Sequence, residues 1–279
     1  MKTLNTIFIP SAEYERIKSS EFGTIDPSQV NHERLCDDDI EIQENTFGAI
    51  SPGDYKSVSP RIVWLLKESY DKCDKDTKGG HNQALEYNQA PWGDVNRTYE
   101  RIIYSSYMIL HDISYGSALQ VDRDKLEETF RKHVAIVNIN RYPALIHTKS
   151  DDTLIAEWAI IERSRIESEL SLLNPNIIIC GFTFQHFFEE AKDNHSSDNV
   201  RKDLRAGMKI MGYDIPEEKF IALNPEIDKT GNYLFNTKSG ELIVDGYHPA
   251  YLGIGTENYC DELYHSLKAA KKHFAFAVK

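Results

Sequence analysis

Four short, uninterrupted apolar runs are the feature that most constrains the fold of this 279-residue chain. A strand with one face in water alternates apolar and polar side chains, whereas a strand covered on both faces is apolar throughout. The runs therefore predict a sheet that is buried on both faces. They cover residues 62–66, 134–137, 177–180 and, more weakly, 242–244, and residues 220–223 are a candidate fifth strand.

Helical periodicity fills the segments between these runs. It covers residues 95–111, 152–173, 184–193, 198–211 and 258–274. Strands that alternate with helices favour parallel pairing through right-handed crossovers. We therefore expect one α/β domain over residues 59–279, with residues 1–58 as an irregular N-terminal extension that packs on this main body.

Composition narrows the class of protein. No apolar run reaches the roughly 20 residues of a membrane-spanning helix, and the first residues lack the apolar core of a signal peptide. The four cysteines lie far apart and the ten histidines form no metal-binding motif. We expect a cytoplasmic protein that contacts no membrane and needs neither a metal nor another cofactor.

The formal charge of −12 argues against indiscriminate binding of nucleic acid, which needs a concentrated basic surface. A local basic groove remains compatible with this charge, although each basic cluster is more often a solvated helix face. The candidate basic residues are Arg201, Lys202, Arg205 and Lys209, and near the end of the chain Lys268, Lys271 and Lys272.

Each apolar run leads into polar residues that are suited to chemistry. His248 follows the run 242–244, and Pro249 stops the strand there, which frees the imidazole to meet a ligand beyond the strand end. Glu68 follows the first run, where its carboxylate either activates a water molecule or forms an ion pair with a nearby base. The spacing favours neither alternative for Glu68.

The second and third runs end in amide side chains and in glycine. Asn138 and Asn140 lie on one face by alternation, where an amide can read the edge of a nucleobase or can cap the turn before Pro143. Gly181 permits a close approach of a ligand or, more commonly, of a packed helix. A cap and a packing role are the plainer interpretations of these residues.

In this order, the four strand exits resemble the motifs of the uracil-DNA glycosylase superfamily. The resemblance covers roughly residues 60–275 and depends on the order and spacing of motifs that are individually short. The matching residues are Lys67-Glu68-Ser69-Tyr70, Asn138-Ile139-Asn140-Arg141-Tyr142-Pro143, Gly181, and His248-Pro249-Ala250.

The resemblance implies a three-layer α/β/α sandwich around a mainly parallel four-stranded sheet, and hydrolysis of the N-glycosidic bond of a flipped base. It assigns catalytic roles to Glu68 and His248. It assigns base binding to Asn138, with Tyr70 or Trp92 stacking on the base. It further implies a DNA partner, single-stranded or locally opened, bound through a local basic groove.

The chain also departs from the family's motifs. Lys67 and Tyr70 stand where glycine and proline are usual, and Ser69 stands at the position that often carries a catalytic aspartate or asparagine. Lys67 is therefore an additional candidate nucleophile that would attack C1′, and Ser69, Asn140 and Gly181 are additional candidate site residues. Ala250 replaces a phosphate-binding serine. These changes make a modified base at least as plausible a target as uracil, in DNA repair or in antiviral defence.

Two other functions remain open on the sequence alone. One is a catalytically inactive nucleotide- or DNA-binding module with the same fold. The other is a protein-interaction or inhibitor protein that uses its acidic surface. The sequence does not determine the oligomeric state.

Overall fold

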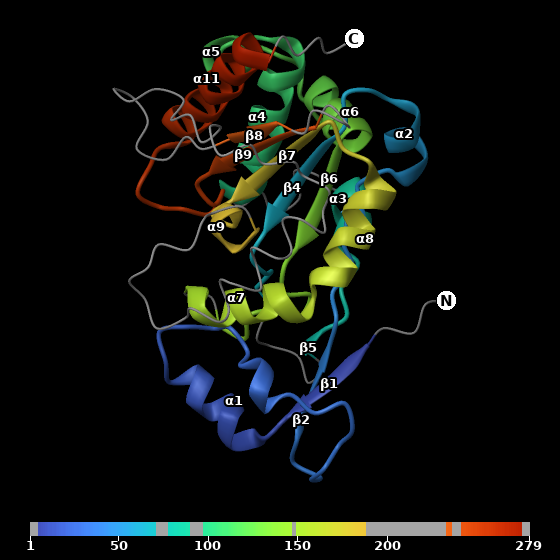
Figure 1. Ribbon diagram of the computed structural model, residues 1–279, viewed down its shortest axis with the longest axis vertical. Coiled ribbons are helices and arrows are strands. Elements are labelled where there is room, and N and C mark those ends of the chain that lie inside the picture. Colours follow the sequence, from blue (N-terminus) through green and yellow to red (C-terminus); the bar gives the residue numbers. More distant parts are fainter. Residues whose placement is uncertain are drawn as a thin grey trace.

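A computed structural model shows a mixed α/β protein that contains two mixed sheets (Figure 1). The residues that the structure describes are 5–70, 78–89, 97–146, 149–187, 233–235 and 241–274. Among the helices of these segments, none has the length and hydropathy needed to cross a membrane.

The larger sheet contains all four strands that the apolar runs predict. They are β4 (Ile62–Leu66), β6 (Val134–Asn138), β7 (Ile177–Gly181) and β9 (Leu242–Gly246). These four pair in parallel in the order β6-β4-β7-β9. Every side chain of β4, β6 and β7 is buried, as the continuous apolar runs require.

Two short antiparallel strands extend this sheet to six strands. β3 (Gly48–Ala49) pairs with β6 at one edge, and β8 (Tyr233–Phe235) pairs with β9 at the other. The predicted number of four strands was therefore too low. Strands of two or three residues carry too little periodicity to be recognised in a sequence. The candidate strand 220–223 and the candidate helix 198–211 lie outside the described residues.

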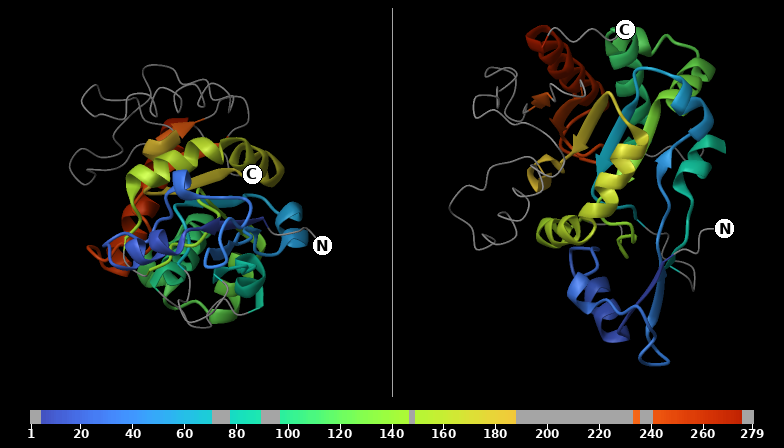
Figure 2. Two further views of the ribbon diagram at one scale, coloured as in Figure 1. Left: turned by 90° about the horizontal axis from the view of Figure 1, so that it is seen from below. Right: turned by 45° about the vertical axis from the view of Figure 1, so that its right-hand side comes forward.

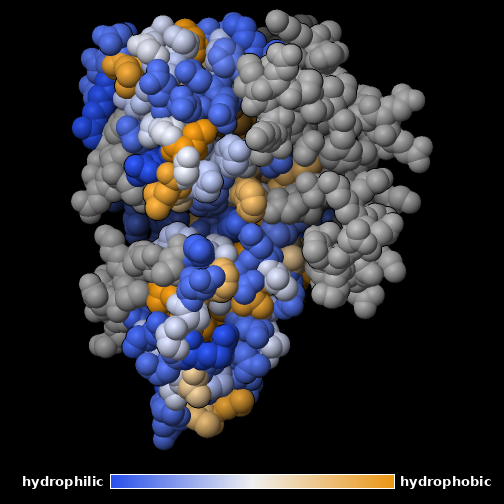
Figure 3. All heavy atoms as spheres, turned by 90° about the vertical axis from the view of Figure 1, so that its left-hand side faces the viewer, coloured by the Kyte–Doolittle hydropathy of each residue, from blue (hydrophilic) through white to orange (hydrophobic). Residues whose placement is uncertain are grey.

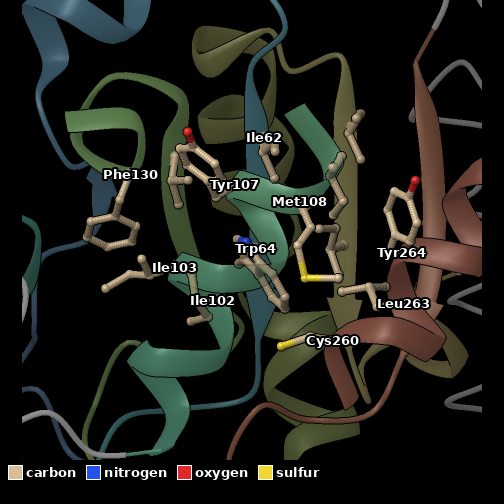
Figure 4. Close-up of a cluster of buried hydrophobic side chains, with 14 of the residues drawn as sticks. Ile62, Trp64, Ile102, Ile103, Tyr107, Met108, Phe130, Cys260, Leu263 and Tyr264 are labelled. Carbon is tan, nitrogen blue, oxygen red and sulfur yellow. The ribbon is translucent and has the colours of Figure 1, made fainter. Parts of the chain in front are cut away.

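Helices cover both faces of the larger sheet. One face packs against α4 (Arg97–His111), α6 (Arg123–His133) and α11 (Thr256–Phe274), and Figure 4 shows Trp64 of β4 at the centre of this cluster. The opposite face packs against α7 (Asp152–Ile161) and α8 (Arg163–Leu173). The shorter helices described after β4 are α3 (Gln83–Gln89), α5 (Tyr115–Ala118) and α9 (Phe184–Phe187).

The prediction of a single helix over residues 152–173 was wrong, because the structure has two helices that meet at Glu162. The Glu162 carboxylate accepts hydrogen bonds from the guanidinium groups of Arg141, at 3.0 Å, and Arg165. Arg141 also pairs with Glu44 of the N-terminal segment. The apolar period continues across the break, so the sequence gives no sign of it.

The N-terminal segment is more regular than its sequence suggests. It forms β1 (Thr6–Ile9), α1 (Ser11–Lys18), the 3-10 turn η1 (Pro27–Gln29), β2 (Ile40–Gln43), β3 and α2 (Pro52–Ser57). The expectation of irregular structure there was wrong, because these elements are too short for a clear period and β2 pairs in parallel with β5 (Lys78–Gly79), far along the chain. The small sheet β1-β2-β5 and α1 lie at one end of the molecule, beyond α7 (Figures 1 and 2).

The boundary expected at residue 58 does not coincide with a boundary between the two sheets. β3, which precedes this residue, belongs to the larger sheet, and β5, which follows it, belongs to the smaller one. Ile7, Ile25 and Ile42 share one buried cluster with Val63 and Leu65 of β4. The N-terminal segment therefore contributes to the core of the molecule.

Candidate functional site

The four parallel strands end at one edge of the larger sheet. The register pairs Leu66 of β4 with Asn138 of β6, and Gly181 of β7 with Gly246 of β9. From β4 the chain passes to β6 on one side, and later to β7 and β9 on the other, so the direction of winding reverses between β4 and β7. Ligands of open α/β sheets bind beyond the carboxyl ends of strands at such a reversal.

Glu68 leaves β4 at this point and is only 5% exposed. Its carboxylate accepts hydrogen bonds from the Thr24 hydroxyl at 2.6 Å and from the Asn140 amide at 3.0 Å, and Ser150 also hydrogen-bonds to it. Burial raises the pKa of Glu68 to about 7, against the lowering effects of these bonds and of the Lys67 charge. A carboxyl with this pKa can gain or lose a proton near neutral pH, as a general acid or base must.

Lys67 does not form the ion pair with Glu68 that the sequence left open. Its ammonium group lies 2.5 Å from Asp152 at the start of α7 and 4.4 Å from the centre of the Phe182 ring. The Lys67 charge nevertheless lowers the pKa of both Glu68 and His248. Lys67 is therefore close enough to influence both candidate catalytic residues.

His248 lies in a turn that follows β9 and is partly buried. Its carbonyl accepts a hydrogen bond from the Tyr251 amide at 2.8 Å, and its Nδ1 accepts one from the Ala250 amide at 3.1 Å. Since Nδ1 accepts, the neutral ring carries its proton on Nε2. Burial, with a smaller effect of Lys67, lowers the pKa of His248 to about 3, so the imidazole is neutral at physiological pH and offers Nε2–H as a donor.

The two candidate asparagines differ in their surroundings. Asn140 donates to Glu68, and its carbonyl oxygen accepts from the Tyr142 amide at 3.0 Å, so the turn interpretation is confirmed for this residue. Asn138 is 2% exposed, and its side-chain oxygen is buried without a hydrogen-bond partner. A buried polar atom left unpaired is costly and requires an explanation. A ligand that donates a hydrogen bond at this edge of the sheet would supply one.

Gly181 allows the His248 turn to approach β7. A Cβ atom on Gly181 would lie 2.6 Å from Leu66 Cδ2, 3.1 Å from Pro249 Cδ and 3.6 Å from the His248 Cα. The close neighbours are therefore two other strand exits, whereas the plainer interpretation expected a helix. Gly181 brings the exits of β4 and β9 together.

Phe182 is a site residue that the sequence did not identify. It has a left-handed backbone conformation, with φ of 57°, and its side chain is 41% exposed although it is aromatic. A non-glycine residue in this region stores strain, and such residues cluster at ligand sites. The sequence places Phe182 next to Gly181 but contains no signal for its conformation.

Ser69 and Tyr70, the next two residues after Glu68, are also hydrogen-bonded. The Ser69 hydroxyl accepts from the Asn45 amide at 2.8 Å, and Tyr70 hydrogen-bonds to Ser150, which also binds Glu68. Burial raises the pKa of Tyr70. The other candidate for stacking, Trp92, lies outside the described residues.

One buried and one partly buried arginine hydrogen-bond to the backbone at the strand exits, and the sequence indicated neither. Arg165 of α8 donates to the carbonyl oxygens of Asn138 and Ile139, both at 2.9 Å. Arg101 of α4 is fully buried and donates to carbonyl oxygens of the segment that follows His248. Each arginine thus fixes the backbone beside one candidate site residue.

Of the candidate basic residues, the structure describes the side chain of Lys268. Lys268 pairs with Asp112 at 3.3 Å and donates to the Tyr264 hydroxyl, which fits the plainer interpretation of a solvated helix face. The side chains of Lys271 and Lys272, and the whole of residues 201–209, lie outside the described part. The basic groove therefore stays a prediction.

One group of described residues has the geometry to hold a metal ion, namely Cys36, Asp38 and Asp39. The Asp39 carboxylate already accepts two backbone amides, at 2.9 Å each, and Asp38 accepts the Ser11 hydroxyl at 2.7 Å. These bonds explain the acidic cluster as a stabilised turn in the N-terminal segment. The turn belongs to a different part of the chain from the strand exits.

No model of a known protein family matches this chain, and comparison with curated proteins gives no match. The case for a function therefore depends on this chain's own residues.

Proposed function

We propose that the protein is a DNA glycosylase-like hydrolase that cleaves the N-glycosidic bond of a flipped uracil or modified base. One observation carries this proposal. His248 accepts a hydrogen bond at Nδ1, which leaves its proton on Nε2 as a donor, and it follows a strand that ends at the same sheet edge as the strand before Glu68. We also infer that the helices on both faces of the larger sheet form the three-layer arrangement that the family resemblance implies.

The proposed chemistry divides between the two residues. As the bond between C1′ and the base nitrogen breaks, negative charge collects on the base and positive charge on the sugar. His248 donates a hydrogen bond to a base oxygen and stabilises that negative charge. Ionised Glu68 stabilises the sugar cation and accepts a proton from the water whose oxygen bonds to C1′. The base leaves as an anion and takes a proton from solvent.

Asn138 supports recognition of the base. Its unpaired side-chain oxygen would accept an N–H from the flipped base, and pairing would remove the cost of the buried, unsatisfied atom. Phe182 would offer an aromatic surface on which a base can stack.

The exposed apolar residues support a nucleic-acid partner on the same side. Figure 3 shows that hydrophobic residues on one face of the molecule form small separate groups among hydrophilic ones. Of the large hydrophobic side chains exposed in the described residues, Phe182, Tyr251 and Leu252 follow strand exits. Apolar side chains in such positions can wedge between base steps and help to open a duplex.

Release of free base from DNA that contains uracil or a modified base tests the proposal. We expect His248→Ala and Glu68→Gln to lower the rate at least about a hundredfold. Glu128→Gln and His265→Ala, at exposed positions on α6 and α11, are matched controls that should keep the rate. Unchanged rates in both site variants would remove these residues from the mechanism.

A second test compares base release from duplex DNA, which must be opened, with release from single-stranded DNA. Leu252, four residues after His248, is 79% exposed, and Leu172 on α8 is 78% exposed. We expect Leu252→Ala to lower base release from duplex DNA about tenfold with little effect on single-stranded DNA. Leu172→Ala should change neither rate. Equal losses on both substrates would contradict a wedge role for Leu252.

One observation favours a second candidate function, an inactive nucleotide-binding module. Glu68 is almost fully buried and already hydrogen-bonds to three side chains, which suits a purely structural carboxyl. Such a module would bind DNA with an affinity that weakens as salt rises, because counterions are released. DNA binding of this kind without release of any base would support the module over the hydrolase.

A further inference from the structure

Arg101 is a fully buried cation whose guanidinium group hydrogen-bonds to backbone carbonyl groups. Its guanidinium group donates to the carbonyl oxygens of Pro249 at 2.9 Å, Tyr251 at 2.7 Å, and Ile254. These three carbonyls belong to the segment that follows His248. Burying an arginine without a carboxylate partner is costly, and its hydrogen bonds to these carbonyls offset part of that cost and restrain the segment.

One of these bonds acts on the peptide group that contacts His248. The Pro249 carbonyl and the Ala250 N–H are the two ends of a single peptide unit, which is planar. Arg101 holds the carbonyl end, and the N–H end donates to His248 Nδ1 at 3.1 Å. Fixing the carbonyl therefore fixes the direction in which the N–H points.

We propose that Arg101 is a positioning residue that holds His248 in the tautomer with its proton on Nε2, through the peptide between Pro249 and Ala250. The positive charge at the carbonyl also polarises this peptide and strengthens its N–H as a donor to Nδ1. The catalytic meaning of this tautomer rests on the proposed function, whereas the arrangement itself does not.

The geometry of the group explains why the residue is an arginine. The guanidinium fork offers five donors in fixed directions, and here it donates to the carbonyls of three residues in the segment after His248, while its Cζ atom lies 4.8 Å from the centre of the Tyr259 ring. A lysine ammonium keeps the charge but cannot reach all three carbonyls in these directions. Arg101→Lys therefore keeps the positive charge and removes the directed hydrogen bonds, so it distinguishes these two contributions.

Nitrogen NMR of histidine-labelled protein tests the proposal without any substrate. In the wild type, we expect a neutral His248 with its proton on Nε2 from about pH 5 to about pH 8, and a through-hydrogen-bond coupling between the Ala250 nitrogen and His248 Nδ1. In Arg101→Lys, we expect a mixture of the two tautomers. The pKa of His248 should rise by about one unit, the size of one lost hydrogen bond.

Arg165→Lys is the matched control. Arg165 holds the Asn138 and Ile139 carbonyls in the same manner but touches no part of the His248 turn in the described structure. This variant should shift the amide signals around Asn138 and leave the His248 tautomer unchanged. A His248 change of equal size in Arg165→Lys would overturn the proposal, because the effect would not be specific to Arg101.

Two other results would overturn it. One is a folded Arg101→Lys protein whose His248 tautomer and titration match the wild type. The other, which needs no variant and decides the question if Arg101→Lys does not fold, is the absence of the coupling between Ala250 and His248 in the wild type.

Base release distinguishes this inference from the proposed function. If the wild type releases base, Arg101→Lys should lower the rate about tenfold at neutral pH, because less of His248 carries its proton on Nε2. If the wild type releases no base but shows the expected NMR behaviour, the role of Arg101 stands and the proposed hydrolase fails.

Discussion

At Glu68, burial competes with hydrogen bonds from three polar neighbours, and burial has the larger effect on the pKa. The folded chain holds the Glu68 proton up to about pH 7, whereas an unperturbed carboxyl releases it near 4.5. Between these values the folded state binds more protons than the unfolded state. The free energy of unfolding therefore falls as pH rises through this window.

Glu68→Gln should remove this pH dependence, because glutamine has no proton to release. Relative to the wild type, the free energy of unfolding of the variant should rise by about 3 kcal/mol between about pH 4 and about pH 8. Urea unfolding across this pH range measures the difference. A constant offset between the two proteins would show that the pKa of Glu68 is not raised.

Glu128→Gln on α6 is the control with the opposite sign. Glu128 is exposed, and its hydrogen bond with Lys132 lowers its pKa, so its contribution to stability is lost as pH falls. Its loss should make the variant slightly less stable than the wild type at higher pH.

The sequence predicts the strand-exit residues of the candidate site but not their surroundings. Glu68, Asn138, Gly181 and His248 follow apolar runs, and a strand exit is a local pattern that can be read directly. Thr24 cannot be read in this way, because it meets Glu68 across 44 positions of the chain. The unpaired oxygen of Asn138 is likewise a property of the folded packing alone.

Among the elements, the close contact of β7 with the turn after β9 sets the shape of the candidate site. Gly181→Ala would place a Cβ atom 2.6 Å from Leu66 Cδ2. We expect a loss of about 1–3 kcal/mol in the free energy of unfolding, as overpacking usually causes, together with displaced amide signals of the His248 turn. Urea unfolding and NMR measure these effects.

Gly246→Ala is the matched control for this prediction. Gly246 pairs with Gly181 in the sheet register, but a Cβ there has its nearest neighbour at 3.6 Å, which is ordinary contact. The free energy of unfolding should change by less than about 1 kcal/mol. Equal losses at both glycines would mean that the cost comes from the strand backbone and not from the contact with the turn.

Element prediction succeeded where a period extends over enough residues. The four parallel strands and α4 and α11 agree with the apolar patterns to within a few residues at their ends. It failed at Glu162, where two helices meet and the carboxylate binds Arg141, a residue that follows a distant strand. Local periodicity contains no information about such a partner.

On the scale of the whole molecule, the N-terminal segment and the larger sheet share one buried cluster. Trp158 of α7 lies in this cluster and donates to the Ile25 carbonyl at 2.8 Å, whereas Trp64 of β4 lies in the cluster on the other face and donates to Ser106 at 3.1 Å. The two indole rings therefore report on different faces of the larger sheet.

Two single-tryptophan proteins can test whether the molecule unfolds as one unit. With Trp92 changed to Phe in both, Trp64→Phe leaves Trp158 as the probe and Trp158→Phe leaves Trp64. After correction for the stability change of each variant by circular dichroism, we expect the fluorescence and circular dichroism transitions in urea to coincide in each protein. An earlier fluorescence transition for Trp158 alone would show that the N-terminal segment unfolds separately.

Within the part of the chain that the structure describes, the outermost strands of the larger sheet are β3 and β8, which at two and three residues are too short to be predicted from the sequence. Their brevity has a consequence for the behaviour of the protein at high concentration. A long strand at the rim of a sheet offers a row of unpaired amide and carbonyl groups on which another chain can add. In the described residues, β3 covers part of the edge of β6 and β8 covers part of the edge of β9, so each parallel strand offers a shorter row of such groups than it would uncovered.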